Sequence, residues 1–497
     1  MTAHVEVRRG HYVDSVSLMQ VSAAVAGGAG VQRANVAMAT ELNLDLLTGM
    51  GFTVPAGAGP NDLVVAIEAD DDAALQDALV QVDAQIASIG QEGSGAGSMS
   101  DEPAPRSTAW ALRRSDAPLA VISVPGEHAF AQAAGALDEG RSVMIFSDNV
   151  PVEHEIILKD KAAEKDLLVM GPDCGTAVIG GVGLGFANRV DRGPVGVVAA
   201  SGTGAQHLTS LLHTAGVGIS HCLGLGGRDL SEQVQGRSAR AALRALDNDP
   251  QTELIVLISK PPHEQVAADL RQFAEGLSTP VQFALLGPGE PTITEAAEAA
   301  LAHLGRPVPQ WPTWQPASAP TPGPGALRGL FAGGTLCDEA MLVAQEVLGP
   351  IHSNIPLRPE LALPADLRHD GHLMIDFGDD QLTQGRPHPM IDGALRVARL
   401  ADEAADPRTR VILLDVVLGY GANPDPAGDL GPAITAAIDT AGADGRSLAV
   451  VVSLCGTDAD PQDLQRQAKT LQGAGAAVFT SNAAAARFAA DLVKEGA

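Results

Sequence analysis

The chain has 497 residues, enough for about three or four domains of ordinary size. Its 60 acidic and 32 basic residues give a formal net charge of −28, which argues against nucleic acid as a partner. The four cysteines are widely spaced and form no CxxC pair, which predicts reduced thiols. The sequence shows neither a basic-then-apolar leader nor an apolar run near the ~20 residues of a membrane span, so we expect a cytoplasmic protein without membrane contact.

The N-terminal 90 residues predict a small α/β module of ferredoxin-like type. The alternation of Val5 and Val7 opens it, and strand patterns at 31–37 and 63–67 alternate with helical patterns at 15–25, 41–50 and 72–89. The stretch 90–107 is rich in Gly, Ser and Pro, which is typical of a flexible linker. We therefore expect a module at 1–90 and a linker at 91–117.

The middle of the chain alternates strand and helix patterns, which predicts parallel sheets with helices on both faces. Its expected strands are 119–123, 142–146, 167–170, 195–199, 221–225, 253–258 and 281–284. A division near 191–194 gives a Rossmann-like domain of CoA-binding type at 118–192 and a flavodoxin-like domain at 193–305. Ligands of such sheets bind at the carboxyl ends of the strands.

The last third repeats this pattern after a Pro-rich stretch at 306–325, which predicts an extended linker. Its expected strands are 329–332, 373–377, 411–417, 447–454 and 477–480. The predicted fold class is therefore α/β: a small N-terminal α/β module, then Rossmann-like and flavodoxin-like domains with parallel sheets, and a C-terminal α/β domain at 326–497.

A glycine-rich turn at 201–204 is the first candidate ligand-binding feature. It joins the apolar run 195–198 to a helical pattern, so its backbone N–H groups and the helix N-terminus are suited to bind an anion. A tight connection without a ligand is the alternative. The candidate residues for phosphate or substrate, taken from this and similar turns, are Ser201, Gly202, Thr203, Gly204, Arg228, Gly334, Thr335 and Asn423.

The densest polar segment lies at 376–392. Asp376, Asp379 and Asp380 are suited to hold Mg²⁺ or to orient Arg386, and His388 lies between two prolines where it is able to move a proton. The catalytic candidates are accordingly His388, Arg386 and Asp379. A solvated surface loop is the alternative, and the absence of GxxxxGK[ST], GxSxG and HExxH excludes a P-loop, a serine hydrolase elbow and a zinc protease.

Several motifs of the middle segment resemble those of the succinyl-CoA synthetase α subunit. Residues 171–176 resemble its GPNCPG turn, 196–203 its GIVSRSGT motif, 222–227 its CVGIGG motif and 147–151 a TEGIP-like turn. Nearly the whole chain, including 12–15, 333–341, 378–390 and 419–427, resembles the FdrA family, relatives of that subunit.

The resemblance implies a subunit of an oxamate carbamoyltransferase of allantoin catabolism, which works with two other polypeptides and is expected to form an oligomer. Its small anionic substrates are oxalurate and phosphate in one direction, and oxamate and carbamoyl phosphate in the other. Phosphate is expected on 201–204, and Arg386 and His388 are expected to polarise the carbamoyl group or the carboxylate. Backbone N–H groups at a glycine-rich turn suit the developing oxyanion.

A CoA-binding enzyme, either an acyl-CoA synthetase or a transferase, is the alternative reading, and a noncatalytic scaffold that binds a metabolite is a third. The resemblance implies a CoA-like site made of Ser123, Pro125, Gly126, Ser147, Asn149, Asp173, Cys174 and Gly175. Cys174 itself is expected to be a small packing residue. One departure bears on the choice: the synthetases carry a phosphorylated histidine after the last middle strand, whereas 285–291 contains none.

Overall fold

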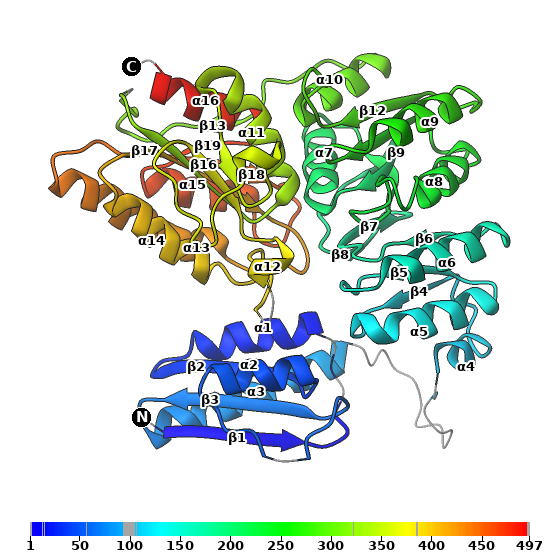
Figure 1. Cartoon of the computed structure of the whole chain (residues 1–497), viewed down its shortest axis with the longest axis horizontal. Helices are drawn as coiled ribbons and strands as arrows, with labels where there is room; N and C mark the ends of the chain where they lie inside the picture. Colours follow the sequence, from blue (N-terminus) through cyan, green and yellow to red (C-terminus); the bar gives the residue numbers. More distant parts are fainter. Residues whose placement is uncertain are drawn as a thin grey trace. The chain divides into compact units, whose positions relative to one another are not determined.

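The computed structural model describes residues 2–11, 13, 15–55, 57–92, 105, 107–321, 323–383 and 386–494. The chain forms two compact units (Figure 1). The first comprises Met1–Arg106 together with Thr383–Pro387, and the second comprises Ser107–Leu382 and His388–Ala497.

The first unit contains a three-stranded antiparallel sheet of order β1-β3-β2. Its elements are β1 (Thr2–Arg8), α1 (Ser15–Ala26), β2 (Val31–Met38), α2 (Glu41–Gly49), β3 (Leu63–Ala69) and α3 (Asp72–Glu92). The central strand β3 is buried on both faces: Val65 and Ile67 pack with α1 and α3, while Val64 and Ala66 pack with α2. The small α/β module expected from the sequence is therefore present.

The second unit begins with a three-stranded parallel sheet of order β4-β5-β6. Its elements are α4 (Thr108–Leu112), β4 (Leu119–Ile122), α5 (Gly126–Asp138), β5 (Ser142–Ile145), α6 (Val152–Ala163) and β6 (Val169–Met170). Helix α4 packs on α5, so residues 108–112 of the expected 91–117 linker form a helix that belongs to this part of the fold.

A six-stranded sheet of order β12-β11-β9-β10-β7-β8 follows. Its strands are β7 (Thr176–Ile179), β8 (Val182–Gly185), β9 (Arg192–Ala200), β10 (Ile219–Gly224), β11 (Leu254–Ser259) and β12 (Val281–Leu285). Its helices are α7 (Gly202–Thr214), α8 (Arg237–Asp247), α9 (Glu264–Ala274) and α10 (Ile293–His303). Strands β9 to β12 are parallel, whereas β7 and β8 form an antiparallel hairpin.

The β7–β8 hairpin corrects the expected boundary at 192/193, because residues 176–185 already belong to this sheet. Gly180 and Gly181 connect its two strands with φ values of +58° and +87°. Two successive positive φ angles are what a tight hairpin turn requires, and a Gly-Gly pair between apolar runs is its sequence signal.

A seven-stranded sheet of order β13-β19-β18-β17-β14-β16-β15 forms the C-terminal part. Its strands are β13 (Thr313–Trp314), β14 (Ala326–Phe331), β15 (His352–Ser353), β16 (Leu373–Asp376), β17 (Thr409–Val417), β18 (Ala449–Cys455) and β19 (Ala477–Phe479). Its helices are α11 (Gly334–Leu348), α12 (Asp380–Thr383), α13 (Ala394–Ala405), α14 (Pro426–Ala443), α15 (Leu464–Gly473) and α16 (Asn482–Lys494), with a 3₁₀ turn at Pro359–Leu361. Only β13 is antiparallel, and it places part of the expected 306–325 linker at the sheet edge.

The two larger sheets share one hydrophobic core. Val197 and Ala199 of the six-stranded sheet belong to the same buried cluster as Leu413 and Val451 of the seven-stranded sheet. Helix α7 contacts both α10 and α11 within this layer, while α13, α14 and α15 cover the opposite face of the seven-stranded sheet (Figure 1). The shared core therefore fixes the N-terminus of α7 relative to that of α11.

None of the helices in the described ranges combines the length and apolarity needed to cross a bilayer.

Candidate functional site

The turn between β9 and α7 is built around Ser201. This residue caps α7, and its Oγ accepts a hydrogen bond of 3.0 Å from the backbone N–H of Gly204. A Cβ at Gly204 would lie 2.6 Å from Ser201 Oγ and 3.0 Å from Thr335 Cγ2, so only glycine fits there. The predicted strand-to-helix corner is present and closely packed.

The turn between β14 and α11 faces this corner directly. The hydroxyl oxygens of Ser201 and Thr335 are 2.5 Å apart. A Cβ at Gly333 would lie 2.8 Å from Thr203 Oγ1. Two glycine-rich helix starts about 130 residues apart, both singled out in the sequence, thus meet in one place.

Lys260 is the cation of this site, and sequence reasoning missed it. It follows β11 directly and is partly buried. A Cβ at Gly334, the first residue of α11, would lie 2.8 Å from Lys260 Nζ and 2.6 Å from Asp376 Oδ2. Among the described residues none forms a hydrogen bond or ion pair with the Lys260 ammonium, which leaves it available to an anion.

Burial opposes the charge of Lys260, but the carboxylates of Asp338, Asp376 and Asp173 outweigh this effect and raise its pKa. The ammonium is therefore charged at neutral pH. Lys is scarce in this chain, and Lys260 lies just beyond the predicted strand at 253–258. A lysine at the carboxyl end of a parallel strand was therefore the available sequence signal for a ligand-binding cation.

Two buried carboxyl groups face Lys260. Asp376 ends β16 and is only 3% exposed, and burial raises its pKa to about 7 although Lys260 acts in the opposite direction. Asp338 lies one turn into α11, and burial raises its pKa to about 6. The site thus pairs one fixed cation with two carboxyl groups that titrate near neutrality.

The pKa of Asp376 predicts how stability depends on pH. An ordinary Asp in the unfolded chain ionises near pH 3.9, and the folded protein holds this proton up to about pH 7. The contribution of Asp376 to stability is therefore present at low pH and is lost as pH rises from about 4 to 7. We expect Asp376→Asn to raise the melting temperature at pH 8 and to leave it nearly unchanged at pH 4; calorimetry at both pH values checks this, and an equal shift at both would contradict it.

A buried ion pair holds the start of α11 in place. Asp415 in β17 accepts hydrogen bonds from the backbone N–H groups of Ala332 (2.7 Å) and Gly333 (2.8 Å). Its Oδ1 lies 3.0 Å from Arg396 of α13, and both side chains are nearly inaccessible to solvent. These contacts fix the direction in which the α11 N-terminus points.

His388 lies at the edge of the same site. A Cβ at Gly378 would lie 2.9 Å from His388 Nε2, and Gly378 N donates to Asp376 Oδ1 at 2.9 Å. Burial lowers the pKa of His388 to about 4, and its Nδ1 accepts from Met390 N at 3.2 Å. At neutral pH the ring is uncharged and carries its proton on Nε2. It is suited to donate a hydrogen bond rather than to gain and lose a proton, which differs from the sequence expectation.

The other two catalytic candidates are Arg386 and Asp379. Arg386 is exposed and lies in the segment Thr383–Pro387, which belongs to the first unit. Asp379 accepts a hydrogen bond of 3.1 Å from Gln381 N at the start of α12. In the described ranges no group of three or more His, Cys, Asp or Glu is arranged to hold a metal ion, so Asp376, Asp379 and Asp380 do not form the joint Mg²⁺ ligand set considered from the sequence.

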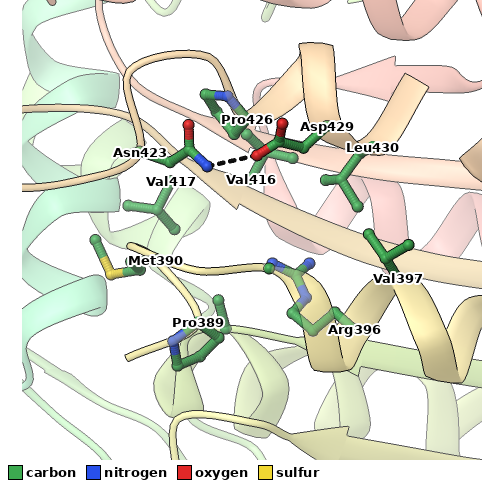
Figure 2. A pocket seen from close by; sticks show the side chains of 12 residues that line it. Pro389, Met390, Arg396, Val397, Val416, Val417, Asn423, Pro426, Asp429 and Leu430 are labelled. Atoms are coloured by element: carbon green, nitrogen blue, oxygen red, sulfur yellow. Dashed lines mark hydrogen bonds between the residues drawn. The ribbon is translucent and has the colours of Figure 1, made fainter. Parts of the chain in front are cut away.

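Arg228 and Asn423 are engaged in structural contacts. Arg228 donates to the Val150 carbonyl at 2.8 Å and lies 3.0 Å from Glu155. Asn423 donates to Asp429 at 2.7 Å beside a cavity of about 20 Å³ (Figure 2). That volume holds about one water molecule, so this cavity is not a substrate site.

The candidate CoA-type residues converge at the carboxyl ends of β4, β5 and β6. Ser147 joins the three turns: its Oγ accepts from Val124 N and its carbonyl accepts from Asp173 N, both at 3.0 Å. A Cβ at Gly126 would overlap the carbonyl of Asp148, so the α5 N-terminus lies directly against the turn that contains Asn149. Ser123, Pro125 and Gly175 belong to the same turns.

Three exposed acidic side chains surround these turns at the carboxyl ends of β4, β5 and β6, namely Glu127, Asp148 and Asp173. Cys174 is buried beneath them, and desolvation raises the pKa of its thiol to about 12, so it is a packing residue as expected. These turns therefore offer backbone donors beside three acidic side chains, of which Asp173 also faces Lys260 and Arg228.

Ser201 provides a test of the paired helix starts. Ser201→Ala removes the cap of α7 and the contact with Thr335, and we expect a loss of unfolding free energy of about 1–2 kcal/mol. Urea denaturation measures this, with Ser201→Thr as the control that keeps a hydroxyl. A Ser201→Ala variant as stable as the parent would contradict this account of the corner.

Two known protein-family models match the two ends of this chain. The CoA-ligase family model matches residues 330–492, and the model described as AllF, heavy metal-associated domain, matches residues 1–103. No cysteine occurs before Cys174, so the AllF-like module of this chain offers no thiolate to a metal. The C-terminal part of the chain is thus similar to CoA-ligase domains.

The chain is 40% identical to the protein YahF of Escherichia coli (strain K12), over 100% of this chain and 99% of YahF, and it belongs to the YahF family, which is FdrA-like. It is also 26% identical to the α subunit of ADP-forming succinate–CoA ligase of Methanothermobacter thermautotrophicus, over 35% of this chain and 60% of that subunit. Among solved structures, the dinucleotide-forming acetyl-coenzyme A synthetase 1 of Ca. Korarchaeum cryptofilum aligns with 80% of this chain and 87% of its own at 16% identity. The TM-score is 0.30, too low to compare the overall arrangements.

Proposed function

We propose that this chain is the catalytic subunit of an oxamate carbamoyltransferase, which converts oxalurate and phosphate into oxamate and carbamoyl phosphate. The observation that carries the proposal is the Lys260 ammonium, which has no hydrogen bond to a described residue and lies at the junction of the α7 and α11 N-termini. Two helix N-termini and one cation suit a phosphate or a small carboxylate. The AllF-type N-terminal module supports a link with allantoin catabolism.

In this proposal phosphate binds between Ser201–Gly204 and Lys260. The carbamoyl carbon of oxalurate lies within reach of a phosphate oxygen, and its carbonyl accepts a hydrogen bond from the neutral His388 Nε2–H. Negative charge that develops on this carbonyl oxygen is stabilised by preorganised donors such as the backbone N–H groups of Gly334 and Thr335.

The turn after β12 favours carbamoyl transfer over a nucleotide-forming ligase. Leu285 ends this strand and no histidine occurs in 285–291, so a relay through a phosphohistidine is not available there. Direct attack of bound phosphate on a carbamoyl group needs no such relay.

The experiment is an assay of carbamoyl phosphate formation from oxalurate and inorganic phosphate. The purified protein is tested alone and with the two partner polypeptides that the family resemblance implies, with which it is expected to form a hetero-oligomer. Product in either mixture supports the proposal. Absence of product with every partner present contradicts it, and phosphate binding without turnover then favours a noncatalytic scaffold.

A CoA-binding enzyme is the second candidate function. Its support is the convergence of the Gly126, Ser147 and Asp173 turns, together with the similarity to CoA-ligase domains. The acidic side chains at these turns oppose binding of the anionic CoA. Calorimetry with CoA separates the two candidates: binding that is abolished by Gly126→Val favours the CoA-binding enzyme.

A further inference from the structure

The proposed reaction requires a proton to move, and the two helix N-termini do not supply a group that moves it. As phosphate attacks, a bond forms between its oxygen and the carbamoyl carbon, and the bond from this carbon to the nitrogen of the leaving oxamate breaks. The proton of the attacking hydrogen phosphate is lost and the leaving nitrogen gains one. A single group between the two positions is sufficient, because the proton count does not change.

The geometry of Asp376 fits this task. Its Oδ2 and Lys260 Nζ both lie against Gly334, where a Cβ would be 2.6 Å and 2.8 Å from them. Oδ1 is held by Gly378 N at 2.9 Å. Asn354 clamps the Asp376 backbone, because it accepts from Asp376 N at 2.9 Å and donates to Asp376 O at 2.8 Å. One carboxylate oxygen is therefore fixed, while the other faces the anion site.

We propose that Asp376 is the acid–base residue of this site, and that it takes the proton from the attacking phosphate and delivers it to the leaving oxamate nitrogen. This inference rests on the proposed carbamoyl transfer. The carboxylate is the active form in both directions of the reaction, since in reverse it takes the proton from the oxamate amide and returns it to phosphate.

The charges around Asp376 support this role. Burial raises the pKa of Asp376 to about 7, close to the value at which proton transfer in both directions is efficient. The titratable and charged groups that face it are Lys260 after β11, Cys337 and Asp338 on α11, Asp415 on β17, Arg396 on α13 and His388 in the following loop. Asp415 is paired with Arg396, and the Cys337 thiol and His388 are neutral, so Lys260 and Asp338 are the unpaired charges that modulate the effect of burial on Asp376.

The test compares the parent with Asp376→Asn by phosphate calorimetry and by the pH profile of carbamoyl phosphate formation in the assembled complex. The variant loses a buried charge, so we expect it to fold and to bind inorganic phosphate at least as tightly as the parent. Its turnover is expected to fall about 10²- to 10⁴-fold. In the parent, the rate of carbamoyl phosphate formation is expected to rise with pH through about pH 7, and this rising limb of the pH profile is expected to be absent in the variant.

Asp338→Asn is the matched variant, because it removes a second buried carboxyl group beside Lys260. It is expected to retain the rising limb. An Asp376→Asn variant that keeps more than about a tenth of the turnover and the same limb overturns the role of Asp376 while the proposed function stands. A parent that binds phosphate but forms no carbamoyl phosphate overturns the proposed function, and with it this inference.

Discussion

Lys260→Met is expected to weaken binding of inorganic phosphate by about 10- to 100-fold, because it removes the one charge-assisted hydrogen bond that a side chain offers the anion here. No described residue forms a hydrogen bond or an ion pair with the ammonium, so its donors are free for the ligand, although the substitution also removes its attraction to the carboxylates of Asp338, Asp376 and Asp173. Calorimetry with phosphate measures the effect. Turnover of the assembled complex should fall by at least the same factor.

Two further variants make this prediction specific. Lys161→Met removes the same charge from a solvent-accessible pair with Asp138, and its phosphate affinity should equal that of the parent. Lys260→Arg keeps the charge but replaces a compact ammonium by a planar fork, so an intermediate affinity is expected. Equal affinity in Lys260→Met and the parent would show that the anion does not bind at this place.

Asp415→Ala is expected to lower the unfolding free energy of the second unit by about 3–5 kcal/mol. It leaves the Arg396 guanidinium buried without its carboxylate, and breaking one half of a buried ion pair is costly. The backbone N–H groups of Ala332 and Gly333 also lose their acceptor. Urea denaturation measures this loss, and phosphate affinity should fall with it because the start of α11 is no longer fixed.

A double-mutant cycle with Arg396→Met isolates the ion pair. In that background no unpaired cation remains, so Asp415→Ala should cost at least about 1 kcal/mol less than in the parent. Strictly additive effects would mean that the two side chains do not interact as described.

The regular elements followed from the sequence because their strands are continuous apolar runs. Leu254–Ser259 is buried at every position, as expected for a strand covered on both faces. The β7–β8 hairpin was missed because each strand has only four residues and glycine takes every second position of β8, although the Gly180-Gly181 pair marked the turn. Strand β13 was missed for a related reason: two residues between prolines give no periodicity.

The candidate site was only partly predictable. The glycines and hydroxyl side chains of the turns at 201–204 and 333–335 indicate anion binding from the sequence alone. Their contact across the shared core depends on how the two sheets pack, which the sequence does not show. Lys260 carries no motif, and it gains its role only because Gly334 and Asp376 are brought to it by that packing. The pKa of His388 depends on its burial, which a sequence flanked by prolines does not reveal.

A crystal structure of the protein with bound phosphate tests the central claim most directly. Phosphate is expected between the N-termini of α7 and α11, within hydrogen-bond distance of Lys260 Nζ and of the Thr335 backbone N–H. Phosphate at the Gly126 and Ser147 turns, and none within hydrogen-bond distance of Lys260 Nζ, would contradict this claim.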